Sequence, residues 1–140
     1  MASRIVAALM AEGVALDALS GRLTAFNMLE TVSAAKYPAL LPRLCAVIFY
    51  EAASSDPEVF QERVRLMGPE DVEVGVPSSR EVVIAARVHR SIHVLAGLRL
   101  ERPGEYVLSI ERKQDADGTW KRTAERRLFV HEQQAAAAAT

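Results

Sequence analysis

The sequence is poor in the features that mark many functional classes. It has one cysteine, so no internal disulfide can form, and the lack of a disulfide framework is typical of a reducing compartment. Aromatic residues make up 6% of the chain, and the formal net charge is −1. Neither value favours a nucleic acid or an anionic membrane as a partner. The composition therefore predicts an ordinary soluble domain.

Long apolar runs are also missing, since no stretch approaches the ~18 residues that a membrane span requires. The apolar run 4–11 resembles the hydrophobic region of a signal peptide. It is short, however, and Glu12 interrupts it before apolar residues resume. We therefore expect a first β-strand in a cytoplasmic protein. A helix over Met1–Ala18 is the alternative, which Gly13 and several β-branched residues disfavour.

Motifs for common chemistries are absent as well. The sequence contains neither Gly-x-x-x-x-Gly-Lys nor Gly-x-Gly-x-x-Gly for phosphate binding, and no Gly-x-Ser-x-Gly nucleophile elbow. The single cysteine, Cys45, lies in the apolar run 44–50, where a cysteine usually acts as a small buried side chain rather than a nucleophile. We expect no enzyme activity and no cofactor.

The three histidines do not form a recognisable metal site. His89 and His93 are four residues apart, a spacing that puts them on one face of a strand but about 13 Å apart. On a helix they would be neighbours and could share a metal ion. Because 81–95 is rich in β-branched residues, we predict a strand there. The sequence then indicates ordinary, partly exposed histidines, with no role assigned to His89, His93 or His131.

Short segments separated by turn signals are what the sequence does contain. Turns are expected at Ser20-Gly21, Asp56-Pro57 and Gly68-Pro69, and an irregular crossover between Tyr37-Pro38 and Leu41-Pro42. The pattern predicts one antiparallel β-sandwich of about eight strands over residues 1–132, followed by an Ala-rich tail at 133–140 that is frayed or disordered. The expected strands before the last hairpin lie within 1–18, 22–32, 44–52, 60–68, 72–76 and 81–95, with a break at 77–79.

The clearest pattern is a closing hairpin at 104–130. Tyr106, Leu108 and Ile110 alternate with polar residues, which is the period of a half-buried strand. The segment 115–118 has the residues of a turn, and it lacks most of the oxygen ligands of a calcium loop.

The start of this hairpin, 102–106, resembles the tyrosine corner of immunoglobulin-like sandwiches. The resemblance implies that Gly104 allows a sharp turn and that the Tyr106 hydroxyl bonds to a loop carbonyl. Leu108 would then stand at a core position. These three residues are expected to be structural.

The layout as a whole resembles a group of uncharacterised bacterial β-sandwich proteins, carried as a domain of unknown function. The matching features are 20–23 with Phe26, Tyr37-Pro38, a strand after 42–44, and the late hairpin. The resemblance implies an immunoglobulin-like sandwich without an assigned activity or catalytic residue.

Two arginines of the last strand are unexpected at their positions. Arg122 and Arg126 interrupt the inward face expected between Trp120 and Leu128. Inward charges either protect a sheet edge or contact a partner. We therefore expect a non-enzymatic structural or protein-interaction module that self-associates or binds another protein. The alternative is a small ligand-binding module for a sugar, a peptide or a metal ion.

Overall fold

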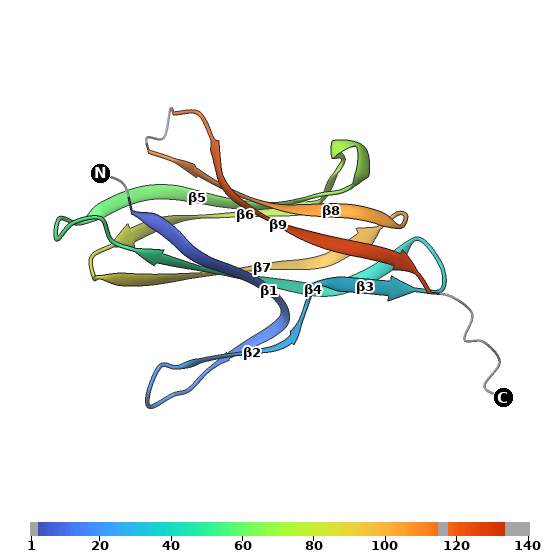
Figure 1. Cartoon of the computed structure of the whole chain (residues 1–140), viewed down its shortest axis with the longest axis horizontal. Helices are drawn as coiled ribbons and strands as arrows, with labels where there is room; N and C mark the ends of the chain where they lie inside the picture. The colour runs from blue at the N-terminus through green and yellow to red at the C-terminus, as the bar shows by residue number, and fades with distance from the viewer. Residues whose placement is uncertain (1–2, 115–117, 134–140) are drawn as a thin grey trace.

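Two β-sheets pack face to face in the computed structural model, which describes residues 3–114 and 118–133 (Figure 1). The predicted all-β sandwich is confirmed, with nine strands in the described residues instead of about eight. The four-stranded sheet has the order β2 (Leu23–Met28), β1 (Arg4–Leu16), β4 (Ala39–Glu51) and β7 (Val88–Leu100). The five-stranded sheet has the order β3 (Thr31–Ala34), β9 (Lys121–Glu132), β8 (Gly104–Lys113), β5 (Glu58–Met67) and β6 (Glu73–Ile84).

Helical structure is confined to one short 3-10 turn, Pro69–Asp71, in the residues described. Within those residues, no helix is long and apolar enough to cross a membrane.

Two segments that were expected to be single strands are each divided between the sheets. The segment 22–32 contains β2 and β3, and β3 pairs with β9 in parallel. Asn27, near the end of β2, has a positive φ of 55°, which departs from extended backbone before the chain crosses to the other sheet. The segment 81–95 likewise contains the end of β6 and the start of β7. Hydrophobic pattern alone does not distinguish a bulge from a change of sheet.

Two proline positions that were expected to end strands lie inside them. Pro77 lies in β6, an edge strand, within the irregularity between the pairs Val64–Ser78 and Leu66–Val74, where a proline is tolerated. Pro42 lies in β4, which begins at Ala39 and replaces most of the expected crossover. The pairing of β1 with β4 ends at Cys45, so Pro42 also lacks a neighbouring strand on that side.

The core lies between the sheets and consists of alternate residues of nearly every long strand. Tyr50, Phe60 and Tyr106 are its largest side chains, each 1% exposed. The aliphatic residues around them include Leu44, Ile48, Val64, Leu66, Leu98, Leu100, Leu108, Ile110 and Leu128.

The start of β8 has the geometry of a tyrosine corner. The Tyr106 hydroxyl donates to the carbonyl of Arg102 at 2.7 Å. Gly104 has φ +148°, and a Cβ there would lie 2.7 Å from Cγ of Pro69. Leu108 has no exposed surface. All three residues therefore anchor the strand.

A β-bulge in β9 changes which side chains face the core. Ile110 pairs with Ala124 and Glu111 pairs with Arg122, which leaves Thr123 as an extra residue. The Thr123 hydroxyl donates to the carbonyl of Ile110 at 3.2 Å. The extra residue reverses the alternation before it, so Arg122 shares the outer face with Glu111. The expectation that Arg122 interrupts the inward face is therefore wrong.

The hairpin formed by β1 and β2 projects from the sandwich (Figure 1). Its turn is closed by the carboxylate of Asp17, which accepts bonds from the N–H groups of Leu19 at 2.9 Å and Ser20 at 2.8 Å. Arg90 of β7 donates to the carbonyl of Gly21 at 3.2 Å, although β2 and β7 are opposite edges of the sheet. The hairpin therefore curls over the outer face of the four-stranded sheet. Met1–Ala18 contributes a strand and not a helix.

Candidate functional site

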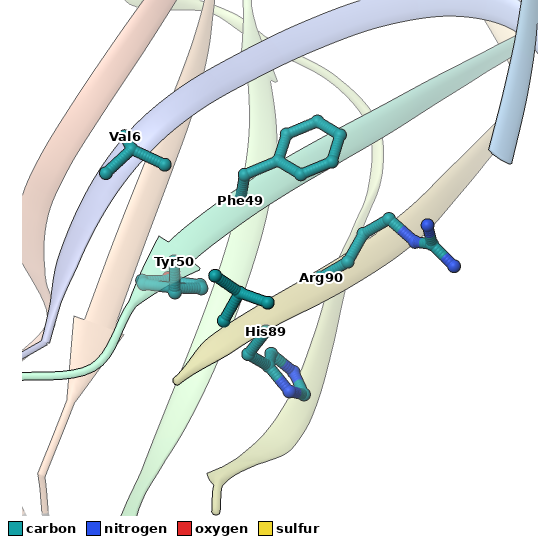
Figure 2. A pocket seen from close by; sticks show the side chains of 6 residues that line it. Val6, Phe49, Tyr50, His89 and Arg90 are labelled. Carbon is teal, nitrogen blue, oxygen red and sulfur yellow. The ribbon is translucent and has the colours of Figure 1, made fainter. Parts of the chain in front are cut away.

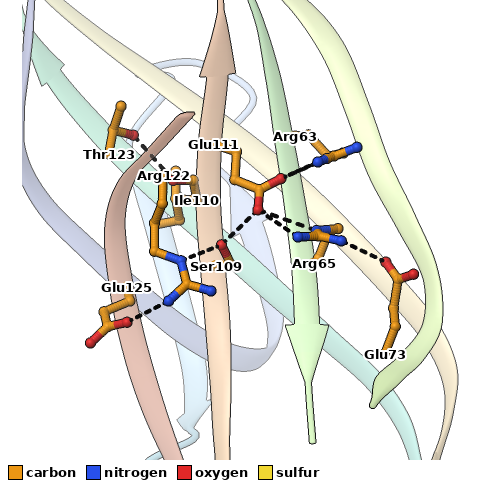
Figure 3. A network of polar contacts seen from close by, with 9 residues as sticks. All are labelled: Arg63, Arg65, Glu73, Ser109, Ile110, Glu111, Arg122, Thr123 and Glu125. Carbon is orange, nitrogen blue, oxygen red and sulfur yellow. Dashed lines mark hydrogen bonds and ion pairs between the residues drawn. The ribbon is translucent and has the colours of Figure 1, made fainter. Parts of the chain in front are cut away.

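The outer face of the five-stranded sheet carries a network of ion pairs (Figure 3). The Glu111 carboxylate accepts a bond from Arg63 Nε at 2.7 Å and one from Arg65 Nη2 at 2.9 Å. Ser109 donates to the same carboxylate at 2.9 Å and accepts a bond from Arg122 Nε, also at 2.9 Å. Burial acts to raise the pKa of Glu111, but its bonds to Arg65, Arg63 and Ser109 hold it below its usual value.

The half-buried aromatic ring of Trp120, beside this network, is engaged within the chain. The guanidinium carbon of Arg63 lies 4.4 Å from the centroid of the Trp120 ring, and Nζ of Lys113 lies 4.7 Å from it. Arg122 also donates to Glu125 at 3.0 Å. Because these cations already have partners in the chain, we interpret the cluster as cross-strand packing rather than as an open anion site.

The two arginines expected to contact a partner lie in different surroundings. Arg122 belongs to the network just described. Arg126 lies beside an open hollow of about 470 Å³ whose lining also includes Glu30 and Phe129. Partner contact by either arginine stays a prediction.

A second polar network lies inside the sandwich. The side chain of Glu62, on β5, has no exposed surface and points at the opposite sheet. Its carboxylate accepts bonds from the Tyr50 hydroxyl, from the Ser91 hydroxyl at 2.5 Å and from His93 Nε2 at 2.5 Å. These three partners come from β4 and β7, so the network ties the two sheets together through their apolar interior.

The histidine extends this network toward an edge of the sandwich. His93 Nδ1 lies 2.9 Å from the Ser78 hydroxyl on β6. The order serine, histidine, carboxylate is that of a hydrolase relay, in which the histidine must also give a proton to the leaving group. The side chains of His93 and Glu62 have no exposed surface, so a leaving group cannot reach the ring. The arrangement supports a structural role.

The three histidines, which were expected to be partly exposed, differ in their burial. His93 was expected to be partly exposed, and this is wrong, because its side chain is fully buried. His89 is half-buried, with its ring centroid 6.4 Å from that of Tyr50, and His131 is exposed. Among the residues that the structure describes, no group of three His, Cys, Asp or Glu side chains could hold a metal ion.

Burial and hydrogen bonding act in opposite directions on Glu62. Burial acts to raise its pKa, but the bonds from His93, Ser91 and Tyr50 together lower it below the usual value. Burial, with the negative charge of Glu62 beside it, raises the pKa of Tyr50. The network therefore contains an ionised carboxylate and a neutral phenol at neutral pH.

Acid is expected to destabilise the protein through Glu62 and Glu111. Both carboxyls have a pKa below the unfolded value of about 4.3, so their stabilisation is complete above that pH and is lost as the pH falls through the folded pKa. Urea unfolding between neutral and acidic pH measures this loss. In Glu111→Gln, the free energy of unfolding should fall less steeply with decreasing pH. Glu81→Gln, at an exposed position, should leave this pH dependence unchanged. An equal slope in both variants would contradict the assignment.

The sequence did contain a signal for the buried network. In the strand predicted to end at Gly68, Glu62 has the same parity as Phe60, Val64 and Leu66, so it had to face inward with them. A carboxylate on a core face needs buried donors. Which donors would meet it depended on the pairing of the sheets and could not be read from spacing.

Most of the outer face of the four-stranded sheet is apolar, in contrast to the polar outer face of the other sheet. One cross-strand row runs from Val94 through Cys45 and Ala11 to Met28, and the next joins Ile92, Val47 and Leu9. Both ends of the first row are 50% exposed. Cys45 is buried at 2% exposure, as predicted, and burial raises the pKa of its thiol.

A hollow of about 490 Å³ opens at the end of this apolar face (Figure 2). Val6, Phe49 and Val88 supply apolar lining, from β1, β4 and β7 respectively. Val6 is the extra residue of a bulge between Ile5 and Ala7. Arg90 of β7, whose side chain points away from that of His89 in Figure 2, adds a basic group to the apolar lining.

Comparison with known proteins is informative about the fold and the family. The crystallised C-terminal domain of Wzt is similar to this chain, with a TM-score of 0.53 at 7% identity. The match covers 95% of this chain and 74% of that one, and at such low identity it concerns the fold alone. No curated protein matches the sequence. A model described as a family of unknown function (DUF6941) matches residues 6–125, and the chain belongs to that family.

Proposed function

We propose that this protein is a non-enzymatic interaction module that associates with a second copy of itself through the outer face of its four-stranded sheet. The exposed apolar side chains of that face and its hairpin carry the proposal. On the strands and the turn of this sheet, the apolar side chains more than 40% exposed are Val6, Leu16, Leu19, Phe26, Met28, Leu40, Val88 and Val94. Exposed apolar side chains gathered on one face are typical of a protein interface.

The two outer faces differ in a way that supports this choice. On the five-stranded sheet, several charged side chains are paired across the strands: Glu111 with Arg63 and Arg65, and Arg127 with Glu105. On the four-stranded sheet, the two cross-strand rows that begin at Val94 and Ile92 contain no charged residue. Its edge strand β2, Leu23–Met28, also has neither a charge nor a proline, the usual protections of an edge against pairing.

Replacing Leu19 by serine is expected to weaken self-association about tenfold or more. The side chain is fully exposed in the isolated chain, so the substitution removes an apolar contact without changing the core. Sedimentation equilibrium at micromolar concentrations measures the dissociation constant.

Val76→Ser is the matched control, because Val76 is 82% exposed but lies on β6 in the other sheet. It should leave the dissociation constant unchanged. A strictly monomeric protein over the whole concentration range would overturn the proposed function.

A further inference from the structure

We infer that the hairpin turn 17–21 of one copy inserts Leu19 into the hollow formed by Val6, Phe49 and Val88 of a second copy. The inference rests on the proposed function and specifies its contact. It makes the association reciprocal, with each copy supplying one turn and one hollow.

The apolar surfaces of the turn and the hollow match. Leu19 is 100% exposed at the tip of the hairpin, where it has no neighbour of its own chain to cover it. In the hollow, Val88 is 70% and Val6 is 50% exposed, and Phe49 also lines it (Figure 2). Inserting the leucine removes apolar area from water on both partners.

The charges of the turn and the hollow are complementary. The turn contains one charged side chain, that of Asp17, and bonds from the backbone of Ser20 and Leu19 hold its pKa below the usual value. Arg90 lines the hollow and supplies its positive charge. An acidic turn that enters a basic, apolar hollow is favoured over a basic segment, whose charge Arg90 would repel.

The turn and the hollow of one chain lie on the same face, so two reciprocal contacts can form at once in a dimer. Arg90 lines the hollow and also donates to Gly21 in the turn of its own chain. Turn and hollow are therefore neighbours. When a twofold axis passes between them, the turn of each copy meets the hollow of the other, which is the closed arrangement of most homodimers.

Intermolecular disulfide formation tests this contact. One copy carries Leu19→Cys and the other, with a different affinity tag, carries Val88→Cys, both with Cys45→Ala to remove the single native thiol. Under a mild oxidant, the mixture is expected to give a cross-linked heterodimer. The matched control pairs Leu19→Cys with Val76→Cys, which is as exposed but lies on β6 of the other sheet. It should cross-link only at the background level.

The outcomes separate this inference from the proposed function. Cross-linking of Leu19→Cys to Val88→Cys well above the control supports the inserted turn. A dimer in sedimentation equilibrium that cross-links no better than the control would overturn the inserted turn and leave the self-association standing. A monomer would overturn both.

A charge variant gives an independent readout. Asp17→Asn keeps the side-chain oxygen that closes the turn and removes only the negative charge. We expect roughly two- to fivefold weaker association, and a smaller dependence on salt, if the carboxylate lies near Arg90 of the other copy. Unchanged affinity and salt dependence would contradict this contact.

Discussion

Replacing Glu62 by alanine is expected to lower the free energy of unfolding by about 3–5 kcal/mol, because it removes one partner of a buried charged network. The Tyr50 and Ser91 hydroxyls and His93 Nε2 would all lose their acceptor in a site without exposed surface. Total stabilities are about 5–15 kcal/mol, so this loss is a large fraction of the whole. Urea unfolding followed by circular dichroism measures it.

The control for this variant is Glu81→Ala. Glu81 is an exposed residue of β6, so its loss should change the free energy of unfolding by less than about 0.5 kcal/mol. Glu62→Gln keeps the shape of the side chain and one acceptor oxygen, and it should fall between the two. If Glu62→Ala cost no more than Glu81→Ala, the network would not be holding the sheets together.

Phe60→Ala is expected to cost about 3–5 kcal/mol, the usual range for truncating a buried phenylalanine. The ring is 1% exposed and meets the ring of Tyr50 edge-on, with 5.4 Å between the ring centroids. The guanidinium carbon of Arg112 also lies 3.8 Å from its centroid. The substitution thus leaves a cavity and removes the aromatic face beside a largely buried cation.

The neighbouring residue provides the matched control. Val59 is 51% exposed and points away from the core, so Val59→Ala should lower the free energy of unfolding by much less. Chemical denaturation of both variants tests the pair. A similar loss in Val59→Ala and Phe60→Ala would show that burial at this position does not control stability.

Alternation and turn residues were enough to predict the class of fold. The hairpin that starts at Gly104 was predicted with its anchor, because the Tyr106, Leu108 and Ile110 pattern and the preceding proline and glycine are local signals. A strand at the N-terminus also followed from residue types alone. These features depend on residues that are close together in the sequence, so the sequence alone is enough to predict them.

The buried network and the bulge were missed for physical reasons. Glu62 and His93 are 31 residues apart and meet only because β5 and β7 face each other from different sheets. In β9, Thr123 reverses the alternation, so a strict period of two misplaced Arg122. A bulge is set by the register against the neighbouring strand, and that register is a tertiary property.

The sequence by itself determined the β-sandwich class of the fold and contains no recognisable catalytic motif, because strand period and turn chemistry are local. Tertiary structure decided which strands pair, where the carboxylate of Glu62 finds its donors, and that the hairpin curls over an apolar face. Each of these depends on contacts between segments far apart in the chain. The candidate interface exists for the same reason: Leu19 and the hollow at Phe49 lie on one face only after the sheet has formed.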